Sequence, residues 1–340
     1  MVLVTLCNLK VGNGTVAYGV GNEGHMDSKG RTVINVKSYG AVGDGITDDT
    51  KAFLDAWEAA CSIESAILQV PRTKTLVVKP STFKGPCQIN ITLLVDGTLV
   101  APSNLEDWGS DRYWLKFTNL NHFKLRGKGT LKAQGKQWWN KSCSYVNSKR
   151  ICGNAPNAIA FQHSEYVQVR DLKIMDSPRF HLHFQTCNHV YAIKIQITSP
   201  QTSPNTDGIH LERTQNAHIL NSTIAAGDDC VSIGHGSYNV TISGLTCGPG
   251  HGISIGSLGK KHSLAQVHNV VVDGALITGT ENGLRIKTWQ GGYGWVRDIV
   301  FKNIVMINVS NPIIIDQYYC DSPEPCANYV SRSSPCIRII

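Results

Sequence analysis

Two aspartates and a histidine occupy the same position in three successive copies of a repeated strand pattern. Asp207, Asp229 and His251 each stand two residues before a recurring pair of apolar residues, and Asp228 precedes Asp229 directly. Carboxylates held close together raise one another's pKa, because like charges resist joint ionisation. One acid can then stay protonated and donate to a leaving oxygen while another, ionised, activates water. Glycoside hydrolysis needs this division of work.

Two cations follow on the same predicted sheet face. Arg285 and Lys287 lie one repeat beyond His251, at positions whose side chains point outward because strand residues alternate between faces. Beside three acids, they are suited to hold a substrate carboxylate. Gly250 and Gly252 leave room next to His251 for a bulky ligand. Taken singly, these residues also fit turn caps, metal ligands, a core histidine or solvated charges, whereas the whole constellation favours a catalytic site.

Short strands in a repeat of 23 to 30 residues must position this constellation. Apolar residues recur at offsets 0, 2, 5 and 7, starting at Val167, Val190, Ala217, Val240, Val270 and Ile299. A second strand in each repeat carries an inward-pointing pair: Ile159/Phe161, Leu182/Phe184, Ile209/Leu211, Val231/Ile233, Ile253/Ile255, Leu284/Ile286 and Ile313/Ile315. Two residues before each pair stand Asn157, Phe180, Asp207, Asp229, His251, Asn282 and Asn311. Period-two alternation of this kind predicts strands.

The repeat predicts an all-β fold, a parallel β-helix, in which stacked coils share one long core. The 340 residues then form one domain, although their number alone suggests two. A propeller needs about 40 residues per blade, and a TIM barrel needs helices between its strands. One short helix is expected after Thr47, Asp48 and Asp49, with the acids suited to its first turn. We expect it to cap the N-terminal end of the stack, with an apolar face of Ala52, Phe53, Ala56, Trp57 and Ala60.

The composition narrows the class of partner. Charged residues form 17% of the chain, and glycine accounts for 32 residues, which suits strands joined by tight turns better than helices. Lys and Arg exceed Asp and Glu by 32 − 25 = 7, so the surface attracts anions weakly. The excess is scattered, which argues against a nucleic-acid partner. The sequence contains no apolar run long enough for a membrane span.

Cysteines and glycosylation sequons favour an oxidising, secretory environment. The chain has 11 cysteines and no CxxC pair, so a zinc ribbon or a thioredoxin-type site is not expected, and the odd number leaves one cysteine unpaired or without its partner. No ordinary signal peptide is visible at the N-terminus, where the apolar stretch from Met1 to Cys7 is very short. The candidate glycosylation sites are Asn13, Asn90, Asn140, Asn221, Asn239 and Asn308.

Four ordered motifs carry a resemblance to a known family. The segments are SPNTDGIH, GDDCVSIG, CGPGHGISIGSLGK and NGLRIKTWQGG, and NPIIIDQYYCD follows them. They resemble the signature segments of polygalacturonases, glycoside hydrolase family 28, and the flanking residues are similar to plant members. The N-terminal NVKSYGAVGDGITDDTKAFLDAWEAAC is similar to the opening of the same group, so that the resemblance runs from about Val33 to Cys326.

The resemblance implies a right-handed parallel β-helix that cleaves α-1,4-linked galacturonan with inversion of configuration. It implies that Asp228 is the general acid and that Asp207 and Asp229 hold and activate the attacking water. His251 would tune the protonation of the acid. Acids one coil apart lie nearer the spacing of about 5–5.5 Å in retaining enzymes than that of about 6.5–9.5 Å in inverting ones. On this point we follow the resemblance, because strand spacing fixes backbones and not carboxyl oxygens.

The resemblance also implies substrate contacts and partners. Arg285 and Lys287 would bind the galacturonate carboxylate, and Asn205 and Tyr319 match positions that line the subsites. The reaction needs no metal and no cofactor. The expected partners are polygalacturonate or pectin and, on the protein side, cell-wall inhibitor proteins, with neither nucleic acid nor membrane involved. We expect a monomer that is secreted to the cell wall.

The expected boundaries are an extension at residues 1–32, the catalytic β-helix at 33–326 and a divergent tail at 327–340. Cys230 and Cys247 match a pair that the family bridges. The resemblance implies two or three further coils after Cys326, but Asn328 to Ile340 show no register match, so C-terminal coils are expected to be missing. We expect an endo-acting polygalacturonase. The alternatives are a catalytically weak or inactive truncated pectin-binding product, an exo-polygalacturonase, and a calcium-dependent pectate lyase.

Overall fold

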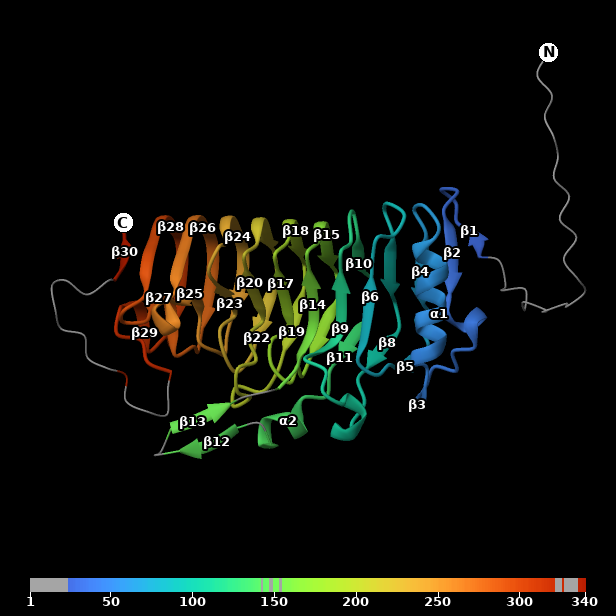
Figure 1. The fold of residues 1–340 in the computed structure, drawn as a ribbon, viewed down its shortest axis with the longest axis horizontal. Helices are drawn as coiled ribbons and strands as arrows, with labels where there is room; N and C mark the ends of the chain where they lie inside the picture. The colour runs from blue at the N-terminus through green and yellow to red at the C-terminus, as the bar shows by residue number, and fades with distance from the viewer. Residues whose placement is uncertain (1–23, 142, 147–148, 153–154, 322–325, 327–335) are drawn as a thin grey trace, which may run out of the picture.

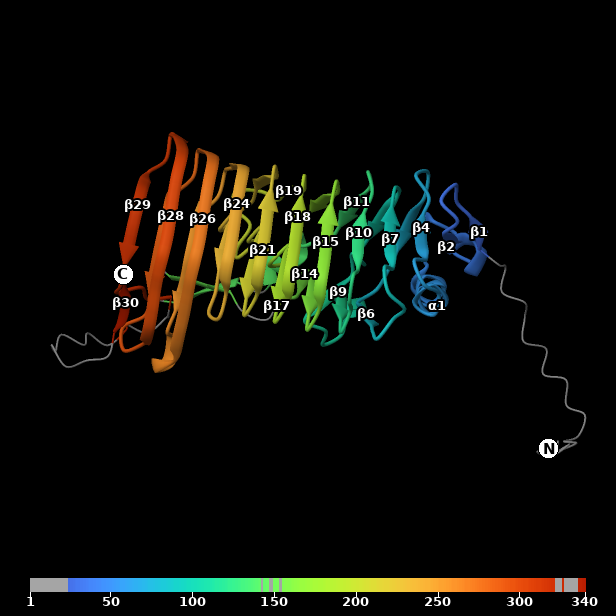
Figure 2. The same cartoon turned by 90° about the horizontal axis from the view of Figure 1, so that it is seen from above.

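The chain winds as a right-handed parallel β-helix in which each coil lays its strands beside those of the next (Figure 1). The computed structural model describes residues 24–141, 143–146, 149–152, 155–321, 326 and 336–340. Successive coils run from the N-terminal to the C-terminal end of the molecule, and the view from above shows the strands nearly parallel to one another (Figure 2). The predicted fold class is confirmed.

One parallel sheet of nine strands carries the predicted site residues, and we call it the site sheet. Its strands, in spatial order, are β6 (Ser81–Lys84), β9 (Tyr113–Thr118), β14 (Asn157–Gln162), β17 (Leu182–Gln185), β20 (Ile209–Glu212), β23 (Val231–Ile233), β25 (Ile253–Leu258), β27 (Asn282–Thr288) and β29 (Asn311–Asp316).

The larger sheet forms the rest of the wall as two rows of strands that merge in the last coils. One row is β2 (Thr32–Asn35), β4 (Ile67–Val70), β7 (Thr92–Val95), β10 (Lys124–Arg126), β15 (Glu165–Arg170), β18 (Asn188–Ile193), β21 (Gln215–Leu220), β24 (Tyr238–Cys247), β26 (Leu264–Thr278), β28 (Tyr293–Ile307) and β30 (Ile337–Ile339). The other is β3 (Asp44–Asp48), β5 (Thr75–Val77), β8 (Thr98–Val100), β11 (Thr130–Lys132), β16 (Lys173–Met175), β19 (Gln196–Thr198) and β22 (Thr223–Ala225), which pairs with β24.

Few elements lie outside these rows. β1 (His25–Met26) pairs antiparallel with β2, and β12 (Cys143–Val146) forms a hairpin with β13 (Lys149–Cys152). The helices are α1 (Thr50–Cys61), α2 (Lys136–Lys141) and three 3₁₀ turns at Val36–Tyr39, Leu105–Trp108 and Lys260–His262. Among the described residues, none of the helices is long and apolar enough to cross a membrane.

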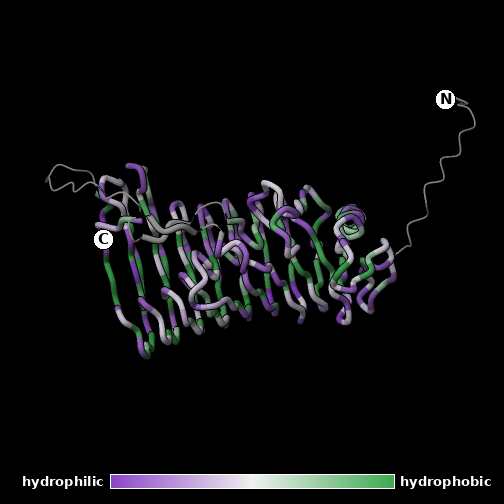
Figure 3. Tube along the Cα trace, turned by 90° about the horizontal axis from the view of Figure 1, so that it is seen from below, coloured by the Kyte–Doolittle hydropathy of each residue, from purple (hydrophilic) through white to green (hydrophobic). Residues whose placement is uncertain are grey.

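The register of the site sheet is the one that the apolar pairs predict. Ile209 lies opposite Val231, Val231 opposite Ile253, and Ile253 opposite Leu284. The first strand of the repeat behaves in the same way, as Val167 lies opposite Val190. Because side chains alternate between faces, this register sends one set into the core and the other into solvent. Figure 3 shows the hydrophobic residues at corresponding places in successive coils.

Stacked aromatic rings support the register in the N-terminal half. Phe83, Phe117, Phe161 and Phe184 lie on four successive strands with ring centroids 4.9, 5.2 and 5.1 Å apart, and all four are fully buried. Each such pair contributes about 0.5–1.5 kcal/mol beyond the burial of its area. Slipping one strand by a residue would break this stack, so the stack also fixes which side chains face outward.

Helix α1 closes the N-terminal end of this core (Figure 1). Phe53, Ala56, Trp57 and Ala60 are buried as predicted, whereas Ala52 is only partly buried. The Trp57 ring contacts that of Phe83 at 5.1 Å. The two acids before the helix have different partners. Asp48 accepts from Thr50 N–H at the helix start, whereas Asp49 accepts from Val42 and Gly43 N–H in the preceding loop. The expectation that these acids serve the first turn of the helix therefore holds for Asp48 alone.

A ladder of asparagines lines one row of turns. The side-chain amides of Asn216, Asn239 and Asn269 donate to Asn188, Asn216 and Asn239 over 2.8, 3.0 and 3.1 Å. Asn216, Asn239 and Asn269 have φ between +52° and +54°, a conformation that asparagine tolerates better than most residues.

One of the predicted glycosylation sites, Asn239, is also a member of this ladder. Asn140, Asn221 and Asn308 are exposed, Asn90 is half-buried, and Asn13 lies outside the described residues.

The disulfide between Cys230 and Cys247 forms as the resemblance implied, and it joins the site sheet to β24. Two more, Cys61–Cys87 and Cys320–Cys326, were not assigned from the sequence. The described residues contain two free thiols, a buried one at Cys187 and an exposed one at Cys336. The odd number of cysteines had predicted one that is unpaired or without its partner.

The last coil is covered differently from the others. Ile313 and Ile315 continue the inward column, yet they are 71% and 60% exposed, against 4% and 6% for Leu284 and Ile286 one strand earlier. Strand β30 pairs with β28 along Gly294–Val296. The tail beyond residue 328 therefore adds one strand at 337–339, although its sequence shows no register match.

Candidate active site

A cleft of about 630 Å³ lies on the outward face of the site sheet. All eight residues predicted for catalysis and substrate binding line it: Asn205, Asp207, Asp228, Asp229, His251, Arg285, Lys287 and Tyr319. They come from the coils of β20, β23, β25 and β27 and from the segment after β29, so the structure brings together residues more than a hundred positions apart. The predicted column and the predicted cations thus form one cluster.

Asp229 is the most enclosed of the three acids, at 1% exposure. Its carboxylate accepts from Arg285 Nη2 at 2.7 Å, from Lys287 Nζ at 2.8 Å and from Ser254 Oγ at 2.7 Å. Burial disfavours the charge on Arg285 and Lys287, but the attraction of Asp229 outweighs it and raises the pKa of both. Two cations and a hydroxyl offset the desolvation of this carboxylate. The cations predicted to meet a substrate carboxylate are thus also partners of Asp229.

Asp228 pairs with His251. His251 Nδ1 lies 3.1 Å from Asp228 Oδ1, and Asn205 Nδ2 donates to Asp228 Oδ2 over 3.4 Å. Burial opposes the ionisation of Asp228, but the hydrogen bond and charge of His251, with the charge of Lys287, hold the pKa of Asp228 below its usual value. Burial likewise opposes the charge on His251, yet Asp228 raises the pKa of that imidazole. In the free protein the proton of this pair therefore resides on the imidazole.

Asp207 differs from its two neighbours. Burial raises its pKa well above the ordinary value, and the charges of Asp228 and Asp229 raise it further. Ser232 Oγ donates to Asp207 Oδ2 at 2.5 Å, which partly offsets the rise. The free protein thus favours a proton on Asp207 over one on Asp228, whereas the resemblance implies that Asp228 is the acid that donates one.

Ser232 links Asp207 to a histidine that was not predicted. His210 Nδ1 lies 2.7 Å from Ser232 Oγ, and since the hydroxyl proton goes to Asp207, the imidazole N–H donates to Ser232. His183, His210, Ser232, Ser254 and Arg285 lie opposite one another on five neighbouring strands. The signal was in the sequence, because these residues stand between the two members of each apolar pair, at the position where only Arg285 was considered.

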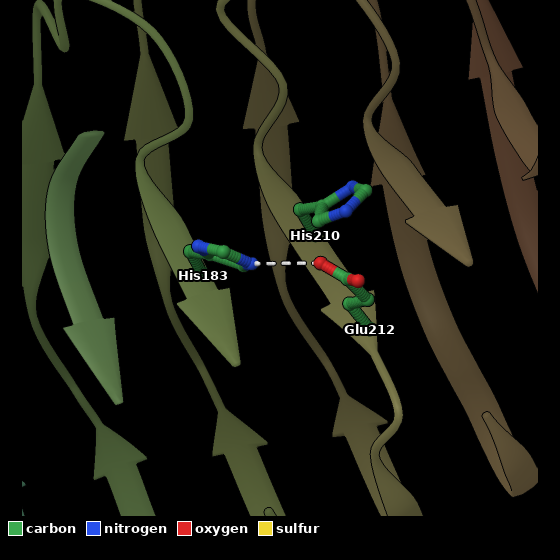
Figure 4. Close-up of side chains that lie close together, drawn as sticks. All are labelled: His183, His210 and Glu212. Carbon is green, nitrogen blue, oxygen red and sulfur yellow. Dashed lines mark ion pairs between the residues drawn. The ribbon is translucent and has the colours of Figure 1, made fainter. Parts of the chain in front are cut away.

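His183, His210 and Glu212 form a second polar cluster (Figure 4), and they line the same cleft as the acids. His183 Nε2 and Glu212 Oε2 are 4.0 Å apart. Burial lowers the pKa of His183 to about 4, helped by the charge of Arg179. Burial also lowers the pKa of His210 well below its ordinary value, and the neighbouring His183 lowers it further. Both rings are therefore neutral in weakly acidic solution.

Cations stand at both ends of the cleft. Arg179 and Arg112 line it on the N-terminal side of the acids, while Arg285 and Lys287 lie on the C-terminal side. The Arg179 guanidinium covers the Phe180 ring at 4.3 Å, and among the described residues it has no carboxylate within 4.0 Å. Positive charge spaced along a groove attracts a polyanion.

Two further features fix the shape of the cleft. Gly252, with φ +81°, has no room for a side chain, since a Cβ there would lie 2.1 Å from Asn282 O, and this close packing sets the backbone next to His251. Tyr319 packs its ring edge-on against Trp289 at 5.7 Å, with Lys287 Nζ 5.4 Å from the ring centre. Tyr319 therefore lines the C-terminal side of the site, while its predicted role in a subsite stays a prediction.

The chain is similar to curated polygalacturonases of plants. It is 51% identical to "Polygalacturonase" of Cryptomeria japonica over 87% of this chain and 58% of that protein. It is 50% identical to "Polygalacturonase" of Persea americana over 87% of this chain and 64% of that protein. The chain thus spans about three fifths of the length of these curated relatives.

Solved structures share the fold. The polygalacturonase from Erwinia carotovora ssp. carotovora aligns with a TM-score of 0.70 at 25% identity, over 89% of this chain and 83% of that one. The exopolygalacturonase from Thermotoga maritima aligns with a TM-score of 0.72 at 23% identity, over 87% of this chain and 77% of that one. The family model of the glycosyl hydrolases family 28 matches residues 61–333, and the chain belongs to that family.

Proposed function

We propose that the protein is a polygalacturonase that hydrolyses α-1,4-galacturonosidic bonds of demethylated pectin. The observation that carries this is the cluster of Asp207, Asp228 and Asp229 in a cleft with cations on both sides. Family membership and two plant relatives named polygalacturonase, at 51% and 50% identity, support the same substrate class. A galacturonan carries one carboxylate per sugar, so its charge pattern complements a groove with separated cations.

In the proposed reaction, the Asp228–His251 pair supplies the proton to the leaving oxygen. The pair holds one proton, and a substrate carboxylate bound near Lys287 weakens the positive field that keeps Asp228 ionised. The proton can then move from His251 Nδ1 to Asp228 Oδ1 across their 3.1 Å contact. A general acid placed in this way contributes about 10²–10⁴-fold to the rate.

Asp207 and Asp229 activate the attacking water in this proposal. Because the pKa of Asp207 is raised, its carboxylate is a stronger base than that of an ordinary aspartate once its own proton has left. Asp229, held by Arg285 and Lys287, orients the same water. Ligand oxygens of Asp228 and Asp229 lie within 4.8 Å of each other, closer than the acid–base separation of about 6.5–9.5 Å in inverting enzymes.

We propose inversion and endo action for this site. The cleft reaches from Tyr113 on β9 to Tyr319 beyond β29, and Asp228 lies between these ends. With parallel strands about 4.8 Å apart, sugar units can lie on both sides of the acids.

The relatives and the disulfides Cys61–Cys87 and Cys230–Cys247 support a secreted, cell-wall location. We also propose a monomer that cell-wall inhibitor proteins can bind.

Product analysis on oligogalacturonides of defined length tests the proposal. Internal cleavage to saturated products, with the new reducing end in the inverted configuration by NMR, is the expected result. Release of single units from one end would replace endo by exo action. Unsaturated, ultraviolet-absorbing products that depend on calcium would mean a lyase. A folded protein with a cooperative melting curve that binds polygalacturonate without cleaving it would leave only the pectin-binding alternative.

A further inference from the structure

The second polar cluster has the composition of a metal site. His183 and His210 lie opposite each other on β17 and β20, and Glu212 follows His210 two residues later on the same face. One potential ligand atom from each residue lies within 4.8 Å of the other two. Two imidazoles and one carboxylate are a ligand set that zinc-type ions use, leaving a fourth position open. That position would face the cleft, since all three residues line it.

His183 gives independent evidence of a missing partner. The residue is only 6% exposed, and its Nε2 atom makes no hydrogen bond within the described part of the chain. A buried polar nitrogen without a partner costs about 1–3 kcal/mol. The atom points toward Glu212 Oε2 at 4.0 Å, too far for a hydrogen bond (Figure 4). Two ligands of one tetrahedral zinc ion lie about 3.4 Å apart, so a small inward movement of Glu212 would let both atoms bind the same ion.

The surrounding hydrogen bonds hold the three ligands in place. His210 donates its Nδ1–H to Ser232, which leaves Nε2 with its lone pair, and metal-bound histidines are usually held in this way. Arg213 Nη1 lies 3.1 Å from Glu212 Oε1, which leaves Oε2 to face His183. Gln185 Nε2 reaches that oxygen only over 3.5 Å.

Asn157 controls which nitrogen of His183 carries the proton. Asn157 Nδ2 lies 3.1 Å from His183 Nδ1, while Asn157 Oδ1 accepts from Phe180 N–H over 3.3 Å. Binding a metal at Nε2 places the ring proton on Nδ1, where Asn157 accepts it once its amide is turned over. The long bond from Phe180 N–H is then lost. An aspartate at position 157 would accept this proton directly and complete a carboxylate–histidine–metal arrangement.

The acids of the active site are a poorer metal site. Asp228, Asp229 and His251 also offer close ligand atoms, but Asp229 already binds Arg285 and Lys287, whose charges repel a cation. In the second cluster Arg213 binds only Oε1 of Glu212, and among the described residues no Lys or Arg lies within 4.0 Å of Oε2, which accepts only the long contact from Gln185.

We propose that His183, His210 and Glu212 bind a zinc-type divalent ion in the cleft, beside the catalytic acids. The bound ion would occupy the groove one strand from Asp229, at a histidine three residues after Asp207, where a polymer has to pass. On the proposed function, zinc-type ions then inhibit pectin cleavage.

Direct binding tests the site without reference to activity. Zinc chloride is titrated by calorimetry into the full, untagged, metal-free chain carrying Cys336→Ser. This substitution removes an exposed thiol that would itself bind zinc. We expect one ion per chain and a loss of about tenfold or more in affinity for His183→Ala and for Glu212→Gln. Asn157→Asp should bind the ion about tenfold more tightly. His218→Gln, which alters an outward histidine stacked on Tyr191 of the larger sheet, is the matched control and should bind as the parent does.

Melting curves of every variant show whether it is folded, and Asn157→Asp keeps the test decisive if His183→Ala does not fold. Absence of binding, equal binding by all variants, or a loss only in His251→Gln would overturn the site. Inhibition is then measured as the fractional loss of each variant's own metal-free rate, and it should disappear in Glu212→Gln. A protein that binds zinc at these residues but shows no cleavage with or without metal would contradict the proposed function and leave the metal site standing.

Discussion

The imidazole of His251 faces the carboxylate of Asp228, with Nδ1 3.1 Å from Oδ1. Its other nitrogen, Nε2, lies 3.4 Å from Glu281 Oε2, so a carboxylate stands on each side of the ring. This arrangement raises the pKa of His251, despite its partial burial, and lowers that of Asp228. The pair therefore stores a proton at a pH where an isolated aspartate would have lost it.

Replacing His251 by Gln should move the alkaline limb of the pH profile to lower pH. In the parent protein the pair loses its proton as the pH rises through the raised pKa of His251, above 6.5. In His251→Gln the proton has to remain on Asp228 itself, which loses it at lower pH. The pH dependence of kcat/KM on polygalacturonate measures the shift, together with a fall in kcat of about 10²-fold or more. An unchanged alkaline limb would contradict the shared proton.

The two adjacent acids should respond differently to the same change. Asp228→Asn should lower the rate of cleavage by about 10²–10⁴-fold. The Tm should change little, because His251 still has Glu281 as an ion-pair partner. Asp229→Asn leaves Arg285 and Lys287, which are 12% and 8% exposed, without their carboxylate. Breaking such a buried pair costs about 3–5 kcal/mol. Thermal melting and activity of both variants test this, and equal melting temperatures would show that the ion pairs contribute no stability.

The sequence was sufficient to predict that two of the acids and His251 lie side by side in one cleft. Strand side chains alternate strictly, so aligning Ile209, Val231 and Ile253 was enough to place Asp207, Asp229 and His251 on neighbouring strands. The contacts among them could not be predicted in this way. Lys287 on β27 extends past β25 to contact Asp229, which directly precedes β23. This contact depends on side-chain conformations that no periodicity in the sequence encodes.

Other features could not be predicted from the sequence, each for a different physical reason. The Phe83–Phe117 stack lies in early coils, before residue 157, where no repeat was recognised. His183 and His210 occupy the outward column, but the lowered pKa of both rings and the unpartnered Nε2 of His183 follow from their burial in the cleft. Composition alone gives no information on such burial.

Ser232→Ala should shift the acidic limb of the pH profile. The Ser232 hydroxyl donates to Asp207 and so favours its ionised form, which lowers its pKa. Without that bond the pKa of Asp207 rises further, and the base becomes available only at higher pH. The acidic limb of kcat/KM should move to higher pH while the alkaline limb, set by the Asp228–His251 pair, stays in place. Ser254→Ala is the matched control, because Ser254 donates to Asp229 instead. A shift of the alkaline limb alone would assign the base to another group.

Asp207→Asn should inactivate the protein and stabilise it near neutral pH. The pKa of Asp207 is raised in the folded chain, first by burial and then by Asp228 and Asp229. A raised pKa means that the folded state favours the protonated carboxyl, so this contribution to stability is full below the unfolded pKa of 3.8 and is lost as the pH rises through the folded pKa. Asparagine keeps the shape and carries no charge at any pH. The Tm difference between Asp207→Asn and the parent should therefore be small near pH 3 and grow toward pH 7. Melting curves across this range measure it, and a difference independent of pH, or a destabilised variant at pH 7, would refute the strained charge at Asp207.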